Sequence, residues 1–288
     1  MICLAVIVLY AAVAIGGVVY EYLAEENPLI PTFAEMADPA RSDQPPSWQG
    51  WNQWQYVLGT DWFGKPILVK TLLAVKVSMS VALIANIIAV PLGMILGAVA
   101  GYYGRKTDAV IVWMFSTLAS IPGLVLLIAL KYAFKEFQPW GLDLTGIHGL
   151  YVAMGVISWI GTCRLVRAEV MKIRELDYIL AARATGTNGF VILLRHVMPN
   201  VLHLGIINFS LGFIGAIKAE VILSYLGLGV EVGTPSWGSM ITAARMNLYM
   251  GKYWELTAAV GAMFLLVLAL NIFGDRLRDA FDPRLRTA

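Results

Sequence analysis

Long apolar runs separated by polar segments make up most of this chain. Six runs carry few charged residues and are expected to cross the bilayer, the fourth being short before Arg164: Ile2–Tyr20, Leu72–Ala100, Ala109–Tyr132, His148–Thr162, Val201–Ile222 and Leu256–Phe273. A helix needs roughly 20 apolar residues to cross the hydrocarbon core of a membrane. The pattern therefore predicts an all-α integral membrane protein with six transmembrane helices. We expect Pro122-Gly123 to bend the third helix.

The first run allows a second interpretation. Ala12-Val13-Ala14 offers the small residues of a signal-peptide cleavage site. However, no positively charged segment precedes the run, and the run is long for a signal peptide. These features favour a retained membrane anchor.

The segment from Glu21 to Lys70 is polar and contains six prolines, seven acidic residues and three basic residues. Such a segment cannot lie in hydrocarbon, where no water satisfies its backbone, so we predict an extramembrane loop. Its aromatic residues suit either a docking surface for a soluble partner or a belt at the membrane interface. They are Trp48, Trp51, Trp54, Tyr56 and Trp62.

Gly59–Pro66 has the glycine and lysine spacing of a phosphate-binding loop. Pro66 stands where that loop needs serine or threonine to hold Mg²⁺. Proline also lacks the backbone N–H that would contact a phosphate. We therefore reject nucleotide binding at this segment.

Composition agrees with a protein that crosses the membrane several times. Hydrophobic residues make up 59% of the 288 residues and charged residues 14%, against about 25% charged residues in soluble domains. The net charge of +2 gives no indication of nucleic-acid binding. Cys3 and Cys163 cannot form a disulfide framework. The three histidines lack the spacing of a zinc site, so no metal site is expected; they are His148, His196 and His203.

Basic residues are unevenly distributed between the polar segments. With the N-terminus placed inside the cell, twelve of the 21 basic residues fall in three short cytoplasmic segments: Arg105, Lys106, Arg164, Arg167, Lys172, Arg174, Arg183, Arg195, Arg276, Arg278, Arg284 and Arg286. Positive charge is enriched in short cytoplasmic loops. The distribution predicts that both termini lie in the cytoplasm.

The polar stretch from Glu175 to Asn200 is predicted to form two helices with a sharp bend between them. Residues from Asp177 to Thr185 include three alanines and favour a helix. Gly186 suits a left-handed residue at the end of that helix. Asn188 can cap a second helix, and we expect Pro199 to end it.

This stretch resembles the cytoplasmic "EAA" loop of permease subunits of binding-protein-dependent ABC importers. Ala181-Ala182, Gly186 and Pro199 carry the spacing, although Leu180 stands where the motif has glutamate and Met198 where leucine is usual. The variant is most similar to that of the C-type subunit of dipeptide, oligopeptide and nickel importers. Three more segments resemble that branch: the Gly59–Pro66 motif, the Ser224–Gly229 and Pro235–Met240 strings, and the tail from Gly274 to Arg286.

The resemblance implies the type I ABC importer permease fold (MetI-like) in the inner (plasma) membrane. A first helix and external loop would occupy residues 1–58, and a five-helix core residues 59–288, with the coupling loop at 175–200. The implied partners are a second permease subunit, two cytoplasmic ABC ATPase subunits and an extracytoplasmic substrate-binding protein. The partner ATPases would bind ATP, so this chain would need no cofactor and have no catalytic residue. The residues implied in ATPase coupling are Asp177, Tyr178, Ala181, Ala182, Arg183, Gly186, Arg195, His196, Pro199 and Asn200.

A few polar residues fall inside the predicted helices. Asn86 and Asn208 lie deep enough to line a polar pathway, although hydrogen bonding between helices is the more common role of such residues. Lys218 and Glu220 lie near the end of their run, where long charged side chains snorkel to the interface. Gly93, Gly97 and Gly101 form a small-residue stripe that predicts close packing against another helix.

Three alternatives remain from the sequence. A nickel importer of the same family shares these motifs. A self-sufficient secondary transporter or channel would show inverted repeats with interrupted helices and a charged midplane site, and neither is visible. A membrane-embedded enzyme would need a cluster of catalytic side chains in the apolar runs, and no such cluster is present.

Overall fold

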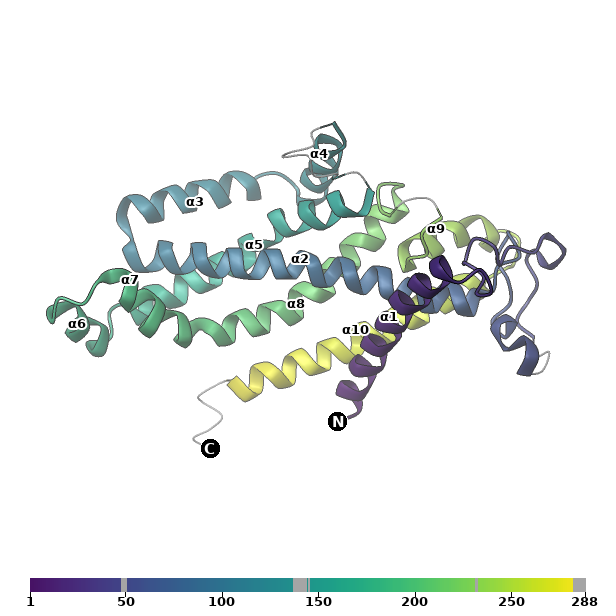
Figure 1. The fold of residues 1–288 in the computed structure, drawn as a ribbon. Coiled ribbons are helices and arrows are strands. Elements are labelled where there is room, and N and C mark those ends of the chain that lie inside the picture. Colours follow the sequence, from purple (N-terminus) through teal and green to yellow (C-terminus); the bar gives the residue numbers. More distant parts are fainter. Residues whose placement is uncertain (48–50, 137–143, 145, 231–232, 282–288) are drawn as a thin grey trace. The chain divides into compact units, whose positions relative to one another are not determined.

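The structure is a computed structural model in which residues 1–47, 51–136, 144, 146–230 and 233–281 are described. Its helices are α1 (Ile2–Glu26), α2 (Ile67–Tyr103), α3 (Arg105–Ala119), α4 (Gly123–Glu136), α5 (Gly146–Ile173), α6 (Asp177–Ala184), α7 (Gly189–Ile192), α8 (Met198–Tyr225), α9 (Trp237–Leu248) and α10 (Trp254–Phe281) (Figure 1). Two short 3₁₀ turns, Pro39–Arg41 and Trp51–Tyr56, lie in the loop after α1. The described residues contain no β-strand, only a single bridge between Thr60 and Pro66. The all-α prediction is confirmed.

Among the described residues, five helices are long and apolar enough to cross a membrane. They are α1, α2, the segment of α5 from Ile147 to Ile173, the continuous helix from Gly189 to Tyr225, and α10. The third predicted span is broken, because α3 and the helix that begins at Gly123 meet at 92°. Pro122 has no N–H to continue the α3 hydrogen-bond ladder, so the bend falls where it was predicted. Counted as one span, this bent pair is the sixth.

Several predicted boundaries were wrong, mostly because polar residues extend the helices. α5 runs well past Thr162 and includes Arg164, Arg167 and Lys172. The segment between Glu220 and Trp254, predicted as a loop, contains α9. Ser236 and Ser239 cap α9 reciprocally through their side chains, a capping box that the sequence pattern did not suggest.

The chain divides into two compact units. Unit 1 comprises Met1–Val81 with Ile217–Phe273, and unit 2 comprises Ala82–Ala216 with Gly274–Ala288. Helices α2, α8 and α10 contribute residues to both units.

In unit 1, polar contacts join the loop after α1 to the membrane helices. The Lys70 Nζ donates to Asp61 at 2.7 Å and to Glu255 at 2.6 Å, all three being largely buried. The Asp61 carboxylate also accepts from the backbone N–H groups of Phe63 and Lys65 at 2.9 Å. These two backbone donors are therefore occupied by Asp61, which gives a structural reason for the rejection of a phosphate site.

The aromatic residues of this loop are only partly described. Trp54 and Trp62 are exposed, whereas Trp48 and the side chain of Trp51 lie outside the described residues. Arg41 lies over the Tyr56 ring at 4.4 Å. Lys65 lies over the Phe33 ring at 4.7 Å, and burial lowers the pKa of its ammonium group. The two interpretations of these aromatics both remain predictions.

In unit 2, the glycine stripe of α2 packs directly on α5, as predicted (Figure 1). A Cβ on Gly93 or Gly97 would lie 2.6 Å from the carbonyl oxygen of Trp159 or Cys163, and one on Gly101 would lie 2.8 Å from that of Arg167. Across α3 and α5, Arg167 pairs with Asp108 through two hydrogen bonds, the Nη2–Oδ2 bond being 2.7 Å long. Cys163 is buried and free.

Candidate functional site: the bent segment between α5 and α8

Helix α6 ends in the left-handed turn that its sequence predicts. Gly186 has a φ of +77°. Its N–H donates to the Arg183 carbonyl at 3.0 Å, and the Thr187 N–H donates to the Ala182 carbonyl at 3.2 Å. These two bonds are the Schellman motif, which satisfies the last carbonyls of a helix. An added Cβ on Gly186 would meet no atom within 4 Å, so glycine is required there for its backbone conformation and not for space.

The second helix begins as predicted but does not end at Pro199. The Asn188 side chain accepts from the Phe190 N–H at 2.8 Å and caps α7. After α7, Leu193–Val197 forms a π-helical turn, and α8 follows from Met198 without a break. Pro199 is the second residue of α8. A wider turn just before it shifts the hydrogen-bond pattern, so the missing N–H of proline no longer ends the helix.

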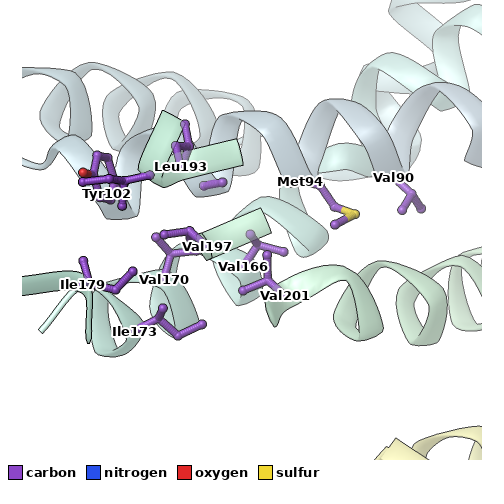
Figure 2. Packing of buried hydrophobic residues seen from close by; sticks show 12 residues of the cluster. Val90, Met94, Tyr102, Val166, Val170, Ile173, Ile179, Leu193, Val197 and Val201 are labelled. Atoms are coloured by element: carbon purple, nitrogen blue, oxygen red, sulfur yellow. The ribbon is translucent and has the colours of Figure 1, made fainter. Parts of the chain in front are cut away.

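One face of this segment is anchored in an apolar core. Ile179 of α6, Ile192 of α7 and Val197 are fully buried. They pack with α5 and α2 residues in the cluster drawn in Figure 2: Val90, Met94, Ala98, Tyr102, Val166, Val170, Ile173, Ile179, Ile192, Leu193, Val197 and Val201. A shift of the bent segment would therefore be transmitted to α2 and α5, because packed cores deform little.

The opposite face of α6 is exposed and partly apolar. Leu176, Tyr178 and Leu180 are 43–46% exposed. Ala181 and Ala184 are exposed beside them, and these side chains leave little bulk on the surface. Large apolar side chains exposed together on one short helix are typical of a surface that binds a partner protein.

The structure brings part of the predicted coupling set together. The Asn200 amide donates to the Tyr178 hydroxyl at 3.0 Å and to the His196 carbonyl at 2.7 Å, which ties α8 to α6. The Arg183 guanidinium lies 4.8 Å from the centre of the Tyr102 ring. Asp177, Arg195 and Pro199 are exposed, and Ala182 packs against the core. The role of these residues in coupling remains a prediction.

The two asparagines proposed for a pathway bond to their own helices. Asn86 is buried, and its amide donates to the Ala82 carbonyl at 2.7 Å. Its Oδ1 lies against Gly212 of α8, where an added Cβ would collide with it. Asn208 is half-buried and donates to the Leu204 carbonyl at 2.8 Å. Whether either lines a pathway remains a prediction.

Glu220 was assigned to the membrane interface, and that assignment was wrong. Its carboxylate is fully buried in unit 1 and accepts hydrogen bonds from Ser224 and Ser236, both at 2.8 Å, and from Ser78 at 3.3 Å. Three hydroxyls replace the water that a snorkelling side chain would reach. In the sequence, only Ser224, one turn after Glu220, indicates locally that this carboxylate could be hydrogen-bonded inside the protein. Ser78 and Ser236 are distant in sequence.

Within the part of the chain that the structure describes, no three histidine, cysteine, aspartate or glutamate residues are grouped to hold a metal ion.

Residues 89–287 match the protein family described as the inner membrane component of binding-protein-dependent transport systems. The chain is 32% identical over 242 residues to a dipeptide transport system permease protein of Bacillus subtilis, covering 84% of this chain and 71% of that protein. It is 30% identical over 245 residues to an oligopeptide transport system permease protein of the same organism, covering 85% of this chain and 75% of that protein. A di/tripeptide transport system permease protein of Pseudomonas aeruginosa is 30% identical over 281 residues, covering 96% of this chain and 89% of that protein.

Proposed function

This chain belongs to the inner membrane components of binding-protein-dependent transport systems, and from that premise we propose that it forms part of the translocation pathway of an ATP-driven peptide importer. Membership of this family makes it a multi-pass protein of the inner membrane. It also makes the chain a transport subunit rather than an enzyme, one that works with an ATPase and a substrate-binding protein.

The bent segment is the observation that supports coupling to the ATPase. It presents exposed apolar side chains on α6, and its other face is anchored in the core that α2 and α5 share. In the proposed cycle, ATP-driven closure of the ATPases moves α6, and the core transmits that movement to the membrane helices. The pathway then opens outward, accepts substrate from the binding protein and releases it inward after hydrolysis.

The proposed assembly contains a second permease subunit as a heterodimer, two cytoplasmic ATPase subunits and an extracytoplasmic binding protein. The ATPase subunits bind ATP, and this chain holds no cofactor of its own. The proposed contact residues are the coupling set on α6, α7 and the start of α8.

Peptides are the proposed substrate because the relatives named above are dipeptide, oligopeptide and di/tripeptide permeases. A nickel substrate is not favoured by these relatives. Within the described residues the absence of a grouped metal-ligand set is compatible with either substrate, because the binding protein selects it.

The test is reconstitution of the chain with its partner permease, ATPases and binding protein in proteoliposomes. Uptake of labelled dipeptides and longer peptides is measured beside uptake of Ni²⁺, with and without ATP. We expect peptide uptake that requires ATP and the binding protein. Substrate uptake by this chain without an ATPase would instead identify a secondary transporter.

A further inference from the structure

A polar hollow of about 600 Å³ lies in unit 2 where the turn between α2 and α3 meets the bent segment. Figure 1 shows α6 and α7 at the same end of the α2–α5 pair as this turn. Three arginines from separate elements line the hollow: Arg105 at the start of α3, Arg174 just after α5, and Arg183 on α6. The proposed coupling to an ATPase makes no use of Arg105 or Arg174.

The charge of the hollow is not balanced by the protein. Arg174 donates to Glu175 at 2.9 Å and to the Gly101 carbonyl at 2.9 Å, so Glu175 is already paired. Asp108, the nearest acid on α3, is paired with Arg167. Among the described residues Arg105 makes no ion pair, and Arg183 contacts the Tyr102 ring instead of a carboxylate. Two positive charges therefore face the hollow without an acidic partner.

Helix α3, which begins at Arg105, continues into an exposed apolar surface. On α3, Ile111 and Phe115 are buried, whereas Val110 and Trp113 are 61% and 69% exposed. Trp113 lies two turns after Arg105, about 12 Å along the helix axis at 1.5 Å per residue. In a membrane-spanning chain, exposed apolar side chains at this position contact acyl chains, and tyrosine and tryptophan favour the interface beside them.

We propose that this hollow binds the headgroup phosphate of an anionic phospholipid, with its acyl chains lying along Val110 and Trp113 of α3. Arginine matches phosphate through paired N–H donors. Tyr102, Tyr103 and Thr187 also line the hollow. Basic pockets between membrane helices on the cytoplasmic side favour anionic headgroups, and the charge distribution predicts that this end of the chain is cytoplasmic.

A phospholipid fits these observations better than an acidic side chain of another protein. An acidic side chain would satisfy the arginines but would leave the apolar stripe on α3 unexplained. A free phosphate would likewise use the arginines alone. A phospholipid uses both, because its phosphate can pair with the arginines while its acyl chains lie along the exposed apolar residues of α3.

The test is native mass spectrometry of the complete transporter in neutral detergent, titrated with dioleoyl-phosphatidylglycerol. Dioleoyl-phosphatidylcholine and inorganic phosphate are the comparison probes. The same spectra count bound lipids and ATPase subunits. We expect phosphatidylglycerol to bind at least tenfold more tightly than phosphatidylcholine. Each arginine that is removed should weaken the binding of phosphatidylglycerol by roughly fivefold. Arg105→Gln should therefore show one fivefold loss of affinity, and the double variant Arg105→Gln/Arg183→Gln two successive fivefold losses.

Lys172→Gln is the matched control, because it removes the same charge from an exposed residue of α5 that does not line the hollow. It should change phosphatidylglycerol binding less than twofold, and Arg105→Lys should retain most of it. Equal losses in Arg105→Gln and Lys172→Gln, or equal binding of the two lipids, would overturn the site. Binding of inorganic phosphate as tight as that of phosphatidylglycerol would overturn the lipid assignment. Loss of ATPase subunits from Arg105→Gln with unchanged lipid binding would instead assign the hollow to the ATPase and overturn the proposal.

Discussion

Glu220 organises the polar contacts of three helices in unit 1 through a single carboxylate. Its oxygens accept from Ser224 of α8, from Ser236 at the start of α9 and from Ser78 of α2. Ser236 also caps α9. Gly238 lies so close to Ser224 that an added Cβ would be 2.5 Å from the serine Cβ. The Ser224–Gly229 and Pro235–Met240 strings thus meet around one buried acid.

Replacement of Glu220 tests whether these contacts stabilise the fold. Glu220→Ala leaves three buried hydroxyls without their acceptor, and each unsatisfied group costs about 1–3 kcal/mol. Glu220→Gln keeps the volume and one acceptor oxygen, and its amide can donate to Ser78. We expect a large loss of thermal stability for Glu220→Ala and a small one for Glu220→Gln, measured by size-exclusion thermostability of the purified complex.

The control for these variants is Lys218→Ala, which alters an exposed residue on the same helix. It should leave the midpoint of thermal unfolding unchanged. If Glu220→Gln destabilised as much as Glu220→Ala, the negative charge and not the hydrogen bonding would be the important property of this site.

Gly97 tests the close approach of α2 and α5. Gly97→Ala places a Cβ 2.6 Å from the Cys163 carbonyl oxygen, which belongs to backbone and cannot rotate away. We expect a loss of about 1–3 kcal/mol, the usual cost of overpacking. Gly161→Ala on α5 adds the same methyl group where no atom lies within 4 Å. The measurement is the melting temperature of each variant, which should be lower for Gly97→Ala than for Gly161→Ala. Equal melting temperatures would show that α2 and α5 can move apart without loss of stability.

At the scale of residues, the sequence predicts what depends on near neighbours. The left-handed Gly186 and the Asn188 cap are local, because both are set by hydrogen bonds within a few residues. The Glu220–Ser78 contact and the Lys70–Glu255 pair were not predictable, because these partners lie far apart in the chain: Ser78 is 142 residues from Glu220, and Glu255 is 185 residues from Lys70. Such contacts exist only after the helices have packed.

At the scale of elements, α9 and the passage of the helix through Pro199 were missed. The apolar residues of α9 are interrupted by polar ones, so its segment resembled a loop. The effect of Pro199 depends on the π turn over Leu193–Val197, which proline rules alone do not reveal. By contrast, the Pro122-Gly123 bend was predicted, because there proline and glycine interrupt an otherwise continuous apolar run.

The bent segment itself is tested at Gly186. Gly186→Val forces a β-branched residue into a left-handed conformation, at a cost of roughly 1–2 kcal/mol. That cost shifts a docking equilibrium about tenfold but is too small to prevent folding of the membrane helices. We expect the variant to insert and to pair with its partner permease, while ATPase subunits are lost or ATP hydrolysis is uncoupled from transport.

Gly186→Asn is the matched variant, because asparagine tolerates the left-handed region and has a side chain larger than that of glycine. No atom lies within 4 Å of an added Cβ there, so it should retain transport. Pull-down stoichiometry and substrate-stimulated ATPase activity in proteoliposomes measure both variants. Wild-type transport by Gly186→Val would show that this turn is not the coupling hinge.

At the scale of the whole molecule, apolar run length predicts membrane helices well. Each predicted run lies within a described helix or, for the third, within the bent α3–α4 pair. The helix ends could not be predicted in the same way, because charged residues such as Arg164 and Arg167 continue α5. Their side chains find partners, the Phe115 ring and Asp108, that the linear pattern does not show.

The orientation of the chain rests on charge distribution alone and can be tested by cysteine labelling. Cysteines placed singly at Ser47, Met250 and Thr185 occupy exposed positions in the loop after α1, in the turn after α9 and after α6. Ser236 is unsuitable for this purpose, because it is fully buried and bonded to Glu220. The background carries Cys3→Ser and Cys163→Ala, so that no native thiol reacts.

An impermeant thiol reagent applied to sealed, right-side-out cells should label the Ser47 and Met250 positions and leave Thr185 unlabelled. The physical reason is the membrane potential and insertion bias that keep short basic loops in the cytoplasm. Permeabilised cells provide the control, in which all three positions should react. Labelling of the Thr185 position in intact cells would reverse the orientation. It would then place α6 on the side of the membrane where no ATPase can reach it, so the proposed coupling role would fall with the topology.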